Sequence, residues 1–285
     1  MNIKIGLWPL SGNYGQIFSQ KYLDEYVEKA VALGFKNFDN AESYGEETFQ
    51  REFCEVLCSK KTVRVDTKIR VDFSQERWLK QLQHDLEKVY NKYGDKLNCV
   101  FLHNPRGTLK QTVLAIETII EYCEVTGRRS GVSLLKDDYE NIDNFPVNVF
   151  QVDLNPTFNS KINQIISAIN PDKIEARSLF GSGLLVSNIK NLAQEDQRQR
   201  WSTPSRLNAG VIFKRRALTH LKNEDALTLA LIKFPALWKI KNVVLGSTNV
   251  KRLKLWQDAS GTTETLDDIK IADLLKKIGR GLYCF

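Results

Sequence analysis

The sequence predicts an α/β fold of the (β/α)8 TIM-barrel class, with a carboxyl-terminal helix and a loop insertion after the seventh strand. The length of 285 residues suits one such barrel or two smaller domains. Short apolar segments typical of strands alternate along the chain with longer amphipathic segments typical of helices. Three successive strands end on polar residues, Asp39, Lys68 and His103, which would meet at the mouth of a parallel barrel. We therefore expect residues 1–285 to form one barrel domain.

The expected strands are short segments in which apolar residues alternate with polar ones or predominate. In chain order they cover residues 3–7, 35–38, 63–68, 97–103, 130–133, 147–152, 173–177 and 241–246. The second strand passes into a polar turn that closes on Gly45, and turn-rich residues 11–15 follow the first.

The expected helices show apolar residues at helical spacing, as Leu23, Tyr26, Val27 and Ala30 do on the first of them. In chain order the helices cover residues 22–33, 46–57, 74–90, 108–123, 207–221, 225–234, 249–256 and 266–278. Acidic residues open the second helix, as the helix dipole favours. Asp72 or Ser74 would cap the third helix, and Asn249 would cap the helix after the last strand.

The polar strand ends suggest proton chemistry at the barrel mouth. Asp39 ends the second strand, Tyr44 follows five residues later, and Lys68 and His103 end the next two strands. Each residue alone has a simpler interpretation, such as a salt bridge or a packed turn. Their order at successive strand ends favours a catalytic site.

Here the chain resembles the aldo-keto reductases. The shared motifs are Asp39-Asn-Ala-Glu-Ser-Tyr44-Gly45, Thr67-Lys68 and His103-Asn-Pro105. The resemblance extends from about Ile3 to about Trp256. It implies reduction of a small-molecule carbonyl with NADPH as the source of hydride. Tyr44 would be the general acid, because Lys68 lowers its pKa, while Asp39 holds Lys68 and His103 orients the substrate oxygen.

The resemblance also implies a cofactor site along the barrel mouth. Independently of the resemblance, the small residues after the seventh strand suit phosphate binding, although they lack the dinucleotide fingerprint Gly-x-Gly-x-x-Gly. The expected cofactor residues are Ser133, Gln151, Arg177, Ser178, Phe180, Gly181, Ser182, Ser247 and Arg252. Trp8 would line the substrate pocket or belong to the barrel core. Gln151 and Arg252 have the alternative of being solvated side chains.

The chain departs from the family pattern at several positions of this site. Leu7 replaces a threonine, Leu134 replaces an asparagine that binds the carboxamide, and Trp256 replaces an asparagine that contacts adenine. Arg177 replaces an aromatic residue that stacks on the nicotinamide, and its charge would oppose the oxidised ring. The segment Arg177-Ser-Leu-Phe180 is similar to a branch of the family found near surface-polysaccharide genes. That likeness suggests a sugar-derived carbonyl.

Other features limit the remaining possibilities. The polar segment 186–205 is interpreted as a lid over the barrel mouth or as a disordered surface loop. Cys54 and Cys58 lie one helical turn apart, but no nearby ligand completes a metal site, so we expect no metal. An NADPH-binding sensor without catalysis is the alternative function.

Composition gives only general expectations. The net charge is +7, and its one cluster, Lys214-Arg215-Arg216, is interpreted as a solvated surface because no nucleic-acid-binding motif accompanies it. No apolar segment approaches the length of a membrane span, and the start lacks a secretory signal. Five scattered cysteines fit a reducing compartment. We therefore expect a cytoplasmic protein that binds neither nucleic acid nor membranes, and the oligomeric state stays open.

Overall fold

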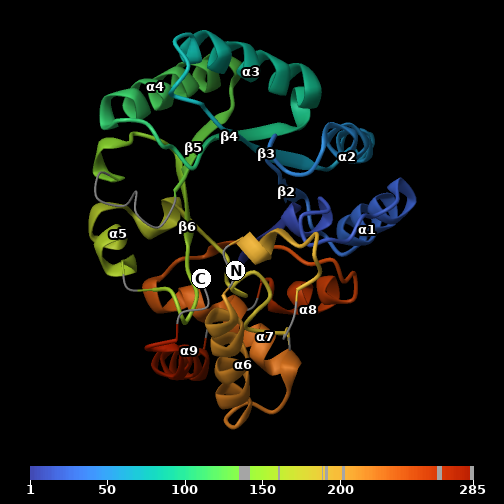
Figure 1. Cartoon of the computed structure of the whole chain (residues 1–285), viewed down its shortest axis with the longest axis vertical. Helices are drawn as coiled ribbons and strands as arrows, with labels where there is room; N and C mark the ends of the chain where they lie inside the picture. Colours follow the sequence, from blue (N-terminus) through green and yellow to red (C-terminus); the bar gives the residue numbers. More distant parts are fainter. Residues whose placement is uncertain are drawn as a thin grey trace.

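Eight parallel strands close into a barrel in the part of the chain that the structure describes (Figure 1). The structure is a computed structural model and describes residues 1–134, 142–159, 161–187, 189, 192–200, 203–261 and 265–282. The strands are β1 (Asn2–Gly6), β2 (Asn37–Asp39), β3 (Arg64–Ile69), β4 (Leu97–His103), β5 (Arg129–Ser133), β6 (Val149–Asp153), β7 (Ile174–Arg177) and β8 (Asn242–Leu245). Each strand pairs with its neighbours in chain order, and β8 pairs with β1. The predicted (β/α)8 barrel is therefore confirmed.

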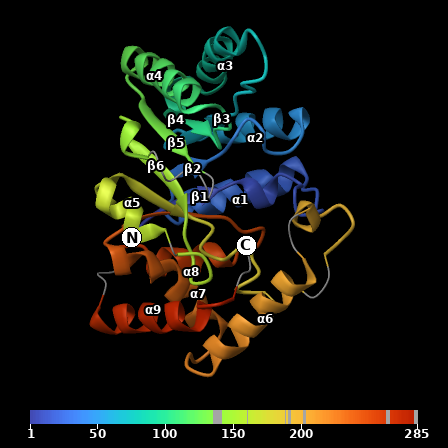
Figure 2. The same ribbon diagram turned by 60° about the vertical axis from the view of Figure 1, so that its left-hand side comes forward.

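The helices surround this barrel. They are α1 (Gln20–Ala32), α2 (Glu47–Ser59), α3 (Trp78–Tyr93), α4 (Leu109–Thr126), α5 (Ile162–Ala168), α6 (Pro204–Leu218), α7 (Glu224–Lys233), α8 (Arg252–Ala259) and α9 (Leu266–Gly279). Short 3-10 turns are η1 (Trp8–Leu10), η2 (Gly94–Lys96), η4 (Pro171–Lys173), η5 (Gln197–Arg200) and η6 (Phe234–Trp238). The predicted carboxyl-terminal helix is α9, which packs against α6, α7 and η6 outside the barrel (Figure 2).

Two predicted helix starts are wrong. The third helix was expected from Ser74, but α3 begins at Trp78, because the Asp72 carboxylate accepts hydrogen bonds from the Ser74 N–H and hydroxyl and closes a separate turn. Asn249 likewise binds the Lys251 N–H within a turn that precedes α8, at 3.0 Å. Both polar side chains satisfy backbone N–H groups, but they do so ahead of the helix.

The interior of the barrel is unusually polar. Successive side chains of a strand point to opposite faces, so one set faces the helices and the other fills the barrel. The helix-facing set, including Val65, Leu102 and Val152, belongs to the main hydrophobic core. Inside, Cys99, Phe101 and Val149 form a small separate apolar cluster, and many of the other inward positions, such as Lys4, Asp66 and Glu175, are charged.

Gly131 on β5 allows this interior to close. A Cβ atom at this position would lie 2.4 Å from the ring of Phe101, so a larger residue would displace that ring. The aromatic side chain occupies the space that glycine leaves, as dense interior packing requires.

In the described part of the chain, no helix combines the length and apolar composition that a bilayer span requires.

Candidate active site

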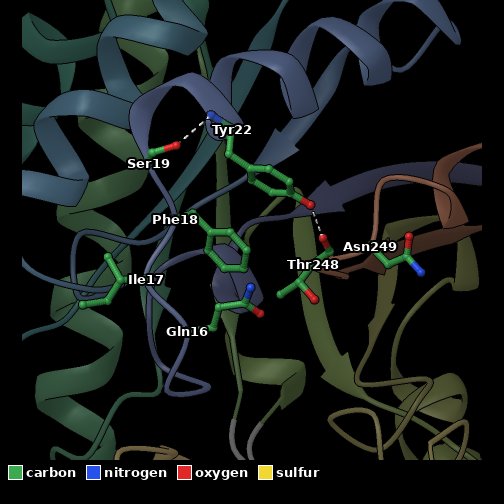
Figure 3. Close-up of a pocket in the computed structure, with 7 residues that line it drawn as sticks. All are labelled: Gln16, Ile17, Phe18, Ser19, Tyr22, Thr248 and Asn249. Atoms are coloured by element: carbon green, nitrogen blue, oxygen red, sulfur yellow. Dashed lines mark hydrogen bonds between the residues drawn. The ribbon is translucent and has the colours of Figure 1, made fainter.

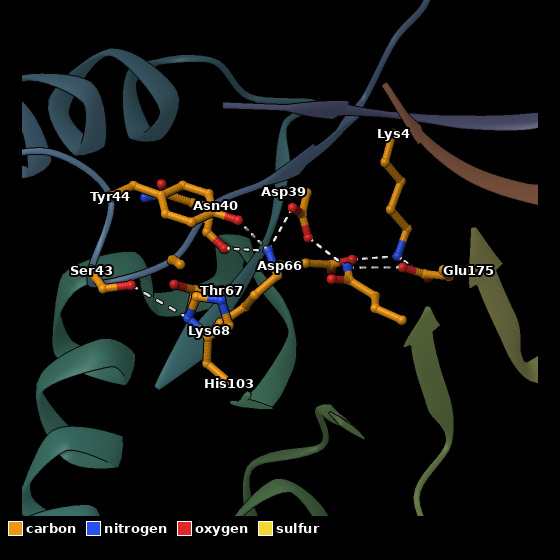
Figure 4. A network of polar contacts seen from close by, with 12 residues as sticks. Lys4, Asp39, Asn40, Ser43, Tyr44, Asp66, Thr67, Lys68, His103 and Glu175 are labelled. Carbon is orange, nitrogen blue, oxygen red and sulfur yellow. Dashed lines mark hydrogen bonds and ion pairs between the residues drawn. The ribbon is translucent and has the colours of Figure 1, made fainter. Parts of the chain in front are cut away.

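Tyr44, Lys68 and Asp39 meet at the carboxyl-terminal mouth of the barrel (Figure 4). The Lys68 ammonium lies 2.5 Å from Asp39 Oδ2 and 3.3 Å from the Tyr44 hydroxyl. All three side chains are buried. The arrangement places a phenol against a cation that a carboxylate holds in place, as the sequence predicted.

The turn that carries Tyr44 has a demanding backbone. Gly45 has a φ of +67°, and a Cβ atom there would lie 2.6 Å from the Ser11 carbonyl oxygen. Only glycine adopts this conformation without strain at such a close approach. The turn is further held by Lys68, which donates to the Asn40 carbonyl at 2.9 Å.

Gln50 on α2 clamps this turn, although it was not among the predicted site residues. Its amide nitrogen donates to the carbonyl of Ala41 at 3.0 Å and to that of Tyr44. Its amide oxygen accepts from the Asn40 side chain and from Lys92 Nζ, both at 3.1 Å. All four hydrogen-bonding positions of this buried amide are thus used. The only sequence signal was a glutamine at an apolar position of an amphipathic helix.

His103 ends β4 beside the same turn. Its Nδ1 lies 3.4 Å from the Ser43 hydroxyl, and its ring stands edge-on to Tyr44 with centroids 6.0 Å apart. Burial holds the pKa of His103 well below its usual value, and Lys68, Arg177 and Arg70 lower it further. The imidazole is therefore neutral near pH 7.

The pKa of Tyr44 corrects one expectation. We expected Lys68 to lower the pKa of the phenol below its usual value. Burial raises the pKa of Tyr44, and this outweighs the opposing effect of Lys68. Tyr44 is therefore protonated at neutral pH, in the form that donates a proton.

A chain of buried polar groups continues below the predicted catalytic residues. Gln151 Nε2 donates to Asp39 Oδ1 at 2.6 Å and to Glu175 Oε2 at 3.2 Å. Glu175 and Asp66 both bind Lys4 at the amino-terminal end of the barrel. Burial raises the pKa of Glu175, with Lys4 opposing the change. Lys4 and Glu175 were not predicted, because the two residues are 171 positions apart in the chain.

Ser133 and Gln151 fit the expected cofactor carboxamide. They face each other in register on β5 and β6. The Ser133 hydroxyl and the Gln151 amide oxygen are buried, and neither has a hydrogen-bond partner among the described residues. Buried polar atoms need partners, and these two could meet an amide from a bound molecule. Gln151 is fully buried, so the alternative of a solvated amide is wrong.

Trp8, predicted to line the substrate pocket, packs edge-on against the Tyr44 ring. The two ring centroids are 4.9 Å apart at an interplanar angle of 74°, and Trp8 remains partly exposed. This position beside the phenol is compatible with contact to a substrate.

The family model for the Aldo/keto reductase family matches residues 2–274. The chain belongs to the aldo/keto reductase family. Membership confirms the predicted enzyme class, an oxidoreductase that uses NADP(H). No curated protein sequence matches the chain closely enough to be reported as a relative.

Solved structures of aldo/keto reductases share the fold at low sequence identity. A glycerol dehydrogenase from Gluconobacter oxydans superposes with a TM-score of 0.72 and 15% identity, over 96% of this chain and 90% of that one. The holo form of an aldo-keto reductase from Bacillus halodurans gives 0.68 and 14%, over 96% and 91%. An aldo-keto reductase from Klebsiella pneumoniae in complex with NADPH gives 0.68 and 13%, over 96% and 90%. These likenesses show the fold.

Arg177, which replaces the usual aromatic residue of the family, is held at the mouth by its neighbours. Its guanidinium donates to the Leu134 carbonyl at 2.9 Å and lies 3.4 Å from Asp153 Oδ2. Asp153 also accepts from the Ser178 hydroxyl at 2.6 Å. Leu134 thus takes part through its backbone, although its side chain is apolar. Asp153 partly offsets the charge that we expected to oppose an oxidised nicotinamide.

The loop after β7 is only partly as expected. The ring of Phe180 is buried and stacks on Trp256 at 6.4 Å, so it belongs to the core and not to an open cofactor surface. Trp256 is fully buried too, as its large apolar surface favours. The Gly181 N–H already binds the Ser178 carbonyl, which removes one of the amides expected to face a phosphate. The Ser182 carbonyl accepts a hydrogen bond from Arg198 Nη1 at 2.9 Å.

Ser247 and Arg252 flank the β8–α8 turn. Ser247 is buried and its hydroxyl accepts from the Asn249 N–H at 3.0 Å, while Arg252 is the partly buried first residue of α8. The adjacent cavity, of about 470 Å³, lies between this turn and the β1–α1 loop (Figure 3). It is lined by Gln16, Ile17, Phe18, Ser19, Tyr22, Thr248 and Asn249. The four predicted catalytic residues lie outside it.

The insertion after β7 is attached to the opposite side of the mouth. Asp196 forms an antiparallel bridge with Tyr14 of the β1–α1 loop, and Gln197 N donates to the Asn13 carbonyl at 2.9 Å. Arg198 pairs with Asp196 at 2.6 Å and lies 4.1 Å from the centroid of the Tyr14 ring. These contacts favour the lid over a disordered loop for residues 192–200. Residues 188, 190–191 and 201–202 of the predicted insertion lie outside the described residues.

Among the described residues, no cluster of three or more His, Cys, Asp or Glu side chains could hold a metal ion.

Proposed function

We propose that the protein reduces an aldehyde or ketone to the alcohol, with Tyr44 as the general acid. The observation that carries this proposal is the buried contact of 3.3 Å between the Tyr44 hydroxyl and the Lys68 ammonium, with Asp39 at 2.5 Å on the other side of that ammonium. A structural salt bridge needs only the Asp39–Lys68 pair, and it does not require a phenol at the cation.

The residues divide the reaction among them. NADPH, when bound, supplies the hydride. Tyr44 donates its proton to the carbonyl oxygen, and Lys68 stabilises the resulting phenolate. Neutral His103 donates a hydrogen bond from Nε2 to the same oxygen if Nδ1 accepts from Ser43. Ser133 and Gln151 would hold the carboxamide, Ser247 and Arg252 would hold the 2′-phosphate, and free backbone N–H groups of residues 178–182 would bind the pyrophosphate.

The substrate class is proposed from the family branch and from the charge of the site. The likeness to the polysaccharide-associated branch favours a sugar-derived carbonyl, since sugar aldehydes and ketones carry hydroxyl groups that suit this polar mouth. The protein is proposed to act in the cytoplasm. The alternative of a non-catalytic sensor is disfavoured, because such a protein has no need for a buried proton donor at a cation.

Substitution of Tyr44 by Phe tests the proposal. The variant keeps the ring that packs against Trp8 and loses only the hydroxyl. We expect NADPH affinity to persist and turnover of aldehydes to fall by roughly 10²- to 10⁴-fold, the usual contribution of general acid catalysis. NADPH oxidation with a panel of aliphatic and sugar aldehydes gives the rate, and fluorescence titration gives the affinity. Near-wild-type turnover would disprove the role of Tyr44, and no turnover by the wild type with any carbonyl would favour the sensor.

A further inference from the structure

Cys54 and Cys58 form a dithiol pair on α2. They lie one helical turn apart, and their Sγ atoms are 3.7 Å from each other. Both sulfurs face the carbonyl oxygen of Lys92 at the end of α3, at 3.3 and 3.7 Å. Both are partly exposed, whereas Cys99 and Cys123 are buried. The catalytic mechanism uses neither member of the pair.

Charged groups from the neighbouring elements favour a thiolate at Cys58. Donation from the Cys54 thiol, with smaller contributions from Lys96 and Lys92, lowers the pKa of Cys58 to about 7 against the effect of burial. Lys96 donates to two backbone carbonyls, which leave its positive charge in place. Glu42 and Tyr93 are the other titratable groups that face the pair. Thiolate at neutral pH is the reactive form of cysteine.

The helix prevents the two thiols from forming an easy disulfide. Residues four apart on a helix have Cβ atoms about 5–6 Å from each other. A disulfide requires about 3.5–4.5 Å between its Cβ atoms. Closing the bond would therefore distort α2. A mixed disulfide formed at Cys58 would not be resolved by Cys54.

We propose that Cys58 is a site of reversible S-thiolation by an anionic low-molecular-weight disulfide such as glutathione disulfide. The Cys58 thiolate attacks one sulfur of the disulfide, a new S–S bond forms, and the old one breaks. Cys58 is oxidised, and the other half of the small disulfide leaves as a thiolate that takes up a proton. Lys96 and Lys92 favour both the attacking thiolate and a negatively charged reagent.

The site has a direct structural connection to the catalytic turn, and this part of the proposal rests on the proposed function. Lys92, whose carbonyl lies against both sulfurs, binds Gln50 at 3.1 Å and Glu42 at 2.9 Å through its ammonium. Gln50 holds the carbonyls of Ala41 and Tyr44. A glutathionyl group between α2 and α3 would displace Lys92 and loosen this clamp. We expect a lower kcat with little change in NADPH affinity.

The test uses the full chain with Cys284→Ser, because Cys284 lies outside the described residues. The protein is incubated with glutathione disulfide, and adducts are followed by intact mass and peptide mapping. We expect one adduct, at Cys58, whose rate of formation falls about tenfold per pH unit below pH 7 and levels off above pH 8. Cys58→Ser should abolish it. Cys54→Ala and Lys96→Gln should slow it at pH 7, while Lys110→Gln on α4, an exposed lysine elsewhere, should not.

The outcomes separate the parts of the proposal. An adduct mainly at another cysteine, no adduct at all, or an intrahelical Cys54–Cys58 disulfide as the main product would overturn the site. Adduct formation needs no turnover, so this result is independent of the proposed function. Carbonyl reduction by the adduct is compared with that of Cys58→Ser after the same treatment. An adduct with unchanged kcat would refute the connection to the catalytic turn.

Discussion

Lys68 reaches the Tyr44 hydroxyl at 3.3 Å from a strand that is separate from the turn carrying the phenol. The same ammonium also binds the carbonyl of Asn40 at 2.9 Å, within that turn. In the proposed mechanism Lys68 therefore has two functions: it holds the turn in place, and it sets the charge beside the proton donor. The two functions can be separated experimentally.

Lys68→Met tests the electrostatic function. The pKa of Tyr44 is already raised by burial, and Lys68 is the largest effect opposing that rise. Removing the cation should raise the pKa further and move the alkaline limb of the pH–rate profile upward, together with a large loss of rate. The profile of kcat between pH 6 and 11 measures this. An unmoved profile, accompanied only by a lower melting temperature, would indicate a structural salt bridge.

Gln50→Leu tests the clamp on the catalytic turn. The substitution removes the hydrogen bonds that Gln50 donates to two backbone carbonyls and those it accepts from Asn40 and Lys92, so we expect a loss of about 1–3 kcal/mol in the free energy of unfolding. Misplacing Tyr44 should lower kcat by about 10- to 100-fold. Because Gln50 does not set the charge at Tyr44, the pH–rate profile should keep its shape.

The control for Gln50 is Gln81→Leu, since Gln81 is exposed on α3. It should leave kcat unchanged. Gln50→Glu retains an acceptor for Lys92 but loses the amide donors, so it should also lower kcat. If Gln50→Leu lost stability without any fall in kcat under conditions where it is folded, Gln50 would have only a structural role.

The low pKa of His103 predicts a specific pH dependence of stability. Above pH 6.5 the imidazole is neutral in both the folded and the unfolded chain. Below pH 6.5 the unfolded chain takes up a proton that the folded chain does not, so this group reduces stability by up to about 1.4 kcal/mol per pH unit. Urea unfolding between pH 7.5 and 5 should show this slope in the wild type and a smaller one in His103→Gln.

His84 and His220 are exposed and provide the comparison. His84→Gln and His220→Gln should leave the dependence of the unfolding free energy on pH unchanged. Neutral His103 also predicts that kcat has no acid limb near pH 6.5. A limb there that disappears in His103→Gln would mean that the imidazole titrates normally.

Arg252→Ala tests the discrimination between NADPH and NADH. The two cofactors differ by the 2′-phosphate, and Arg252 begins α8 beside Ser247, where an arginine can bind such a group with two hydrogen bonds. Charge-assisted hydrogen bonds contribute about 1.5–3 kcal/mol, so NADPH affinity should fall by roughly 10- to 100-fold. NADH affinity should hardly change.

Lys254→Ala is the matched control, since Lys254 is the next cation on α8 and pairs with Asp258. It should affect neither cofactor. Equal losses of affinity for NADH and NADPH in Arg252→Ala would show that other residues determine the cofactor preference.

The sequence alone determined the barrel and the convergence of Asp39, Lys68 and His103. Strand and helix periodicities are local, and parallel strands of a barrel all end at one mouth, so a polar residue at a strand end is placed by its position in the chain. Tyr44 followed from the same logic, because it lies in the turn directly after β2.

Only the tertiary structure decided which distant side chains surround these four. Gln50 contacts the catalytic turn from α2. Glu175 is linked to Asp39 by Gln151, which lies 112 residues after Asp39 in the chain. The balance between burial and charge at Tyr44 likewise depends on everything packed around it. Desolvation and long-range pairing are properties of the packed interior, and no local pattern in the chain records them.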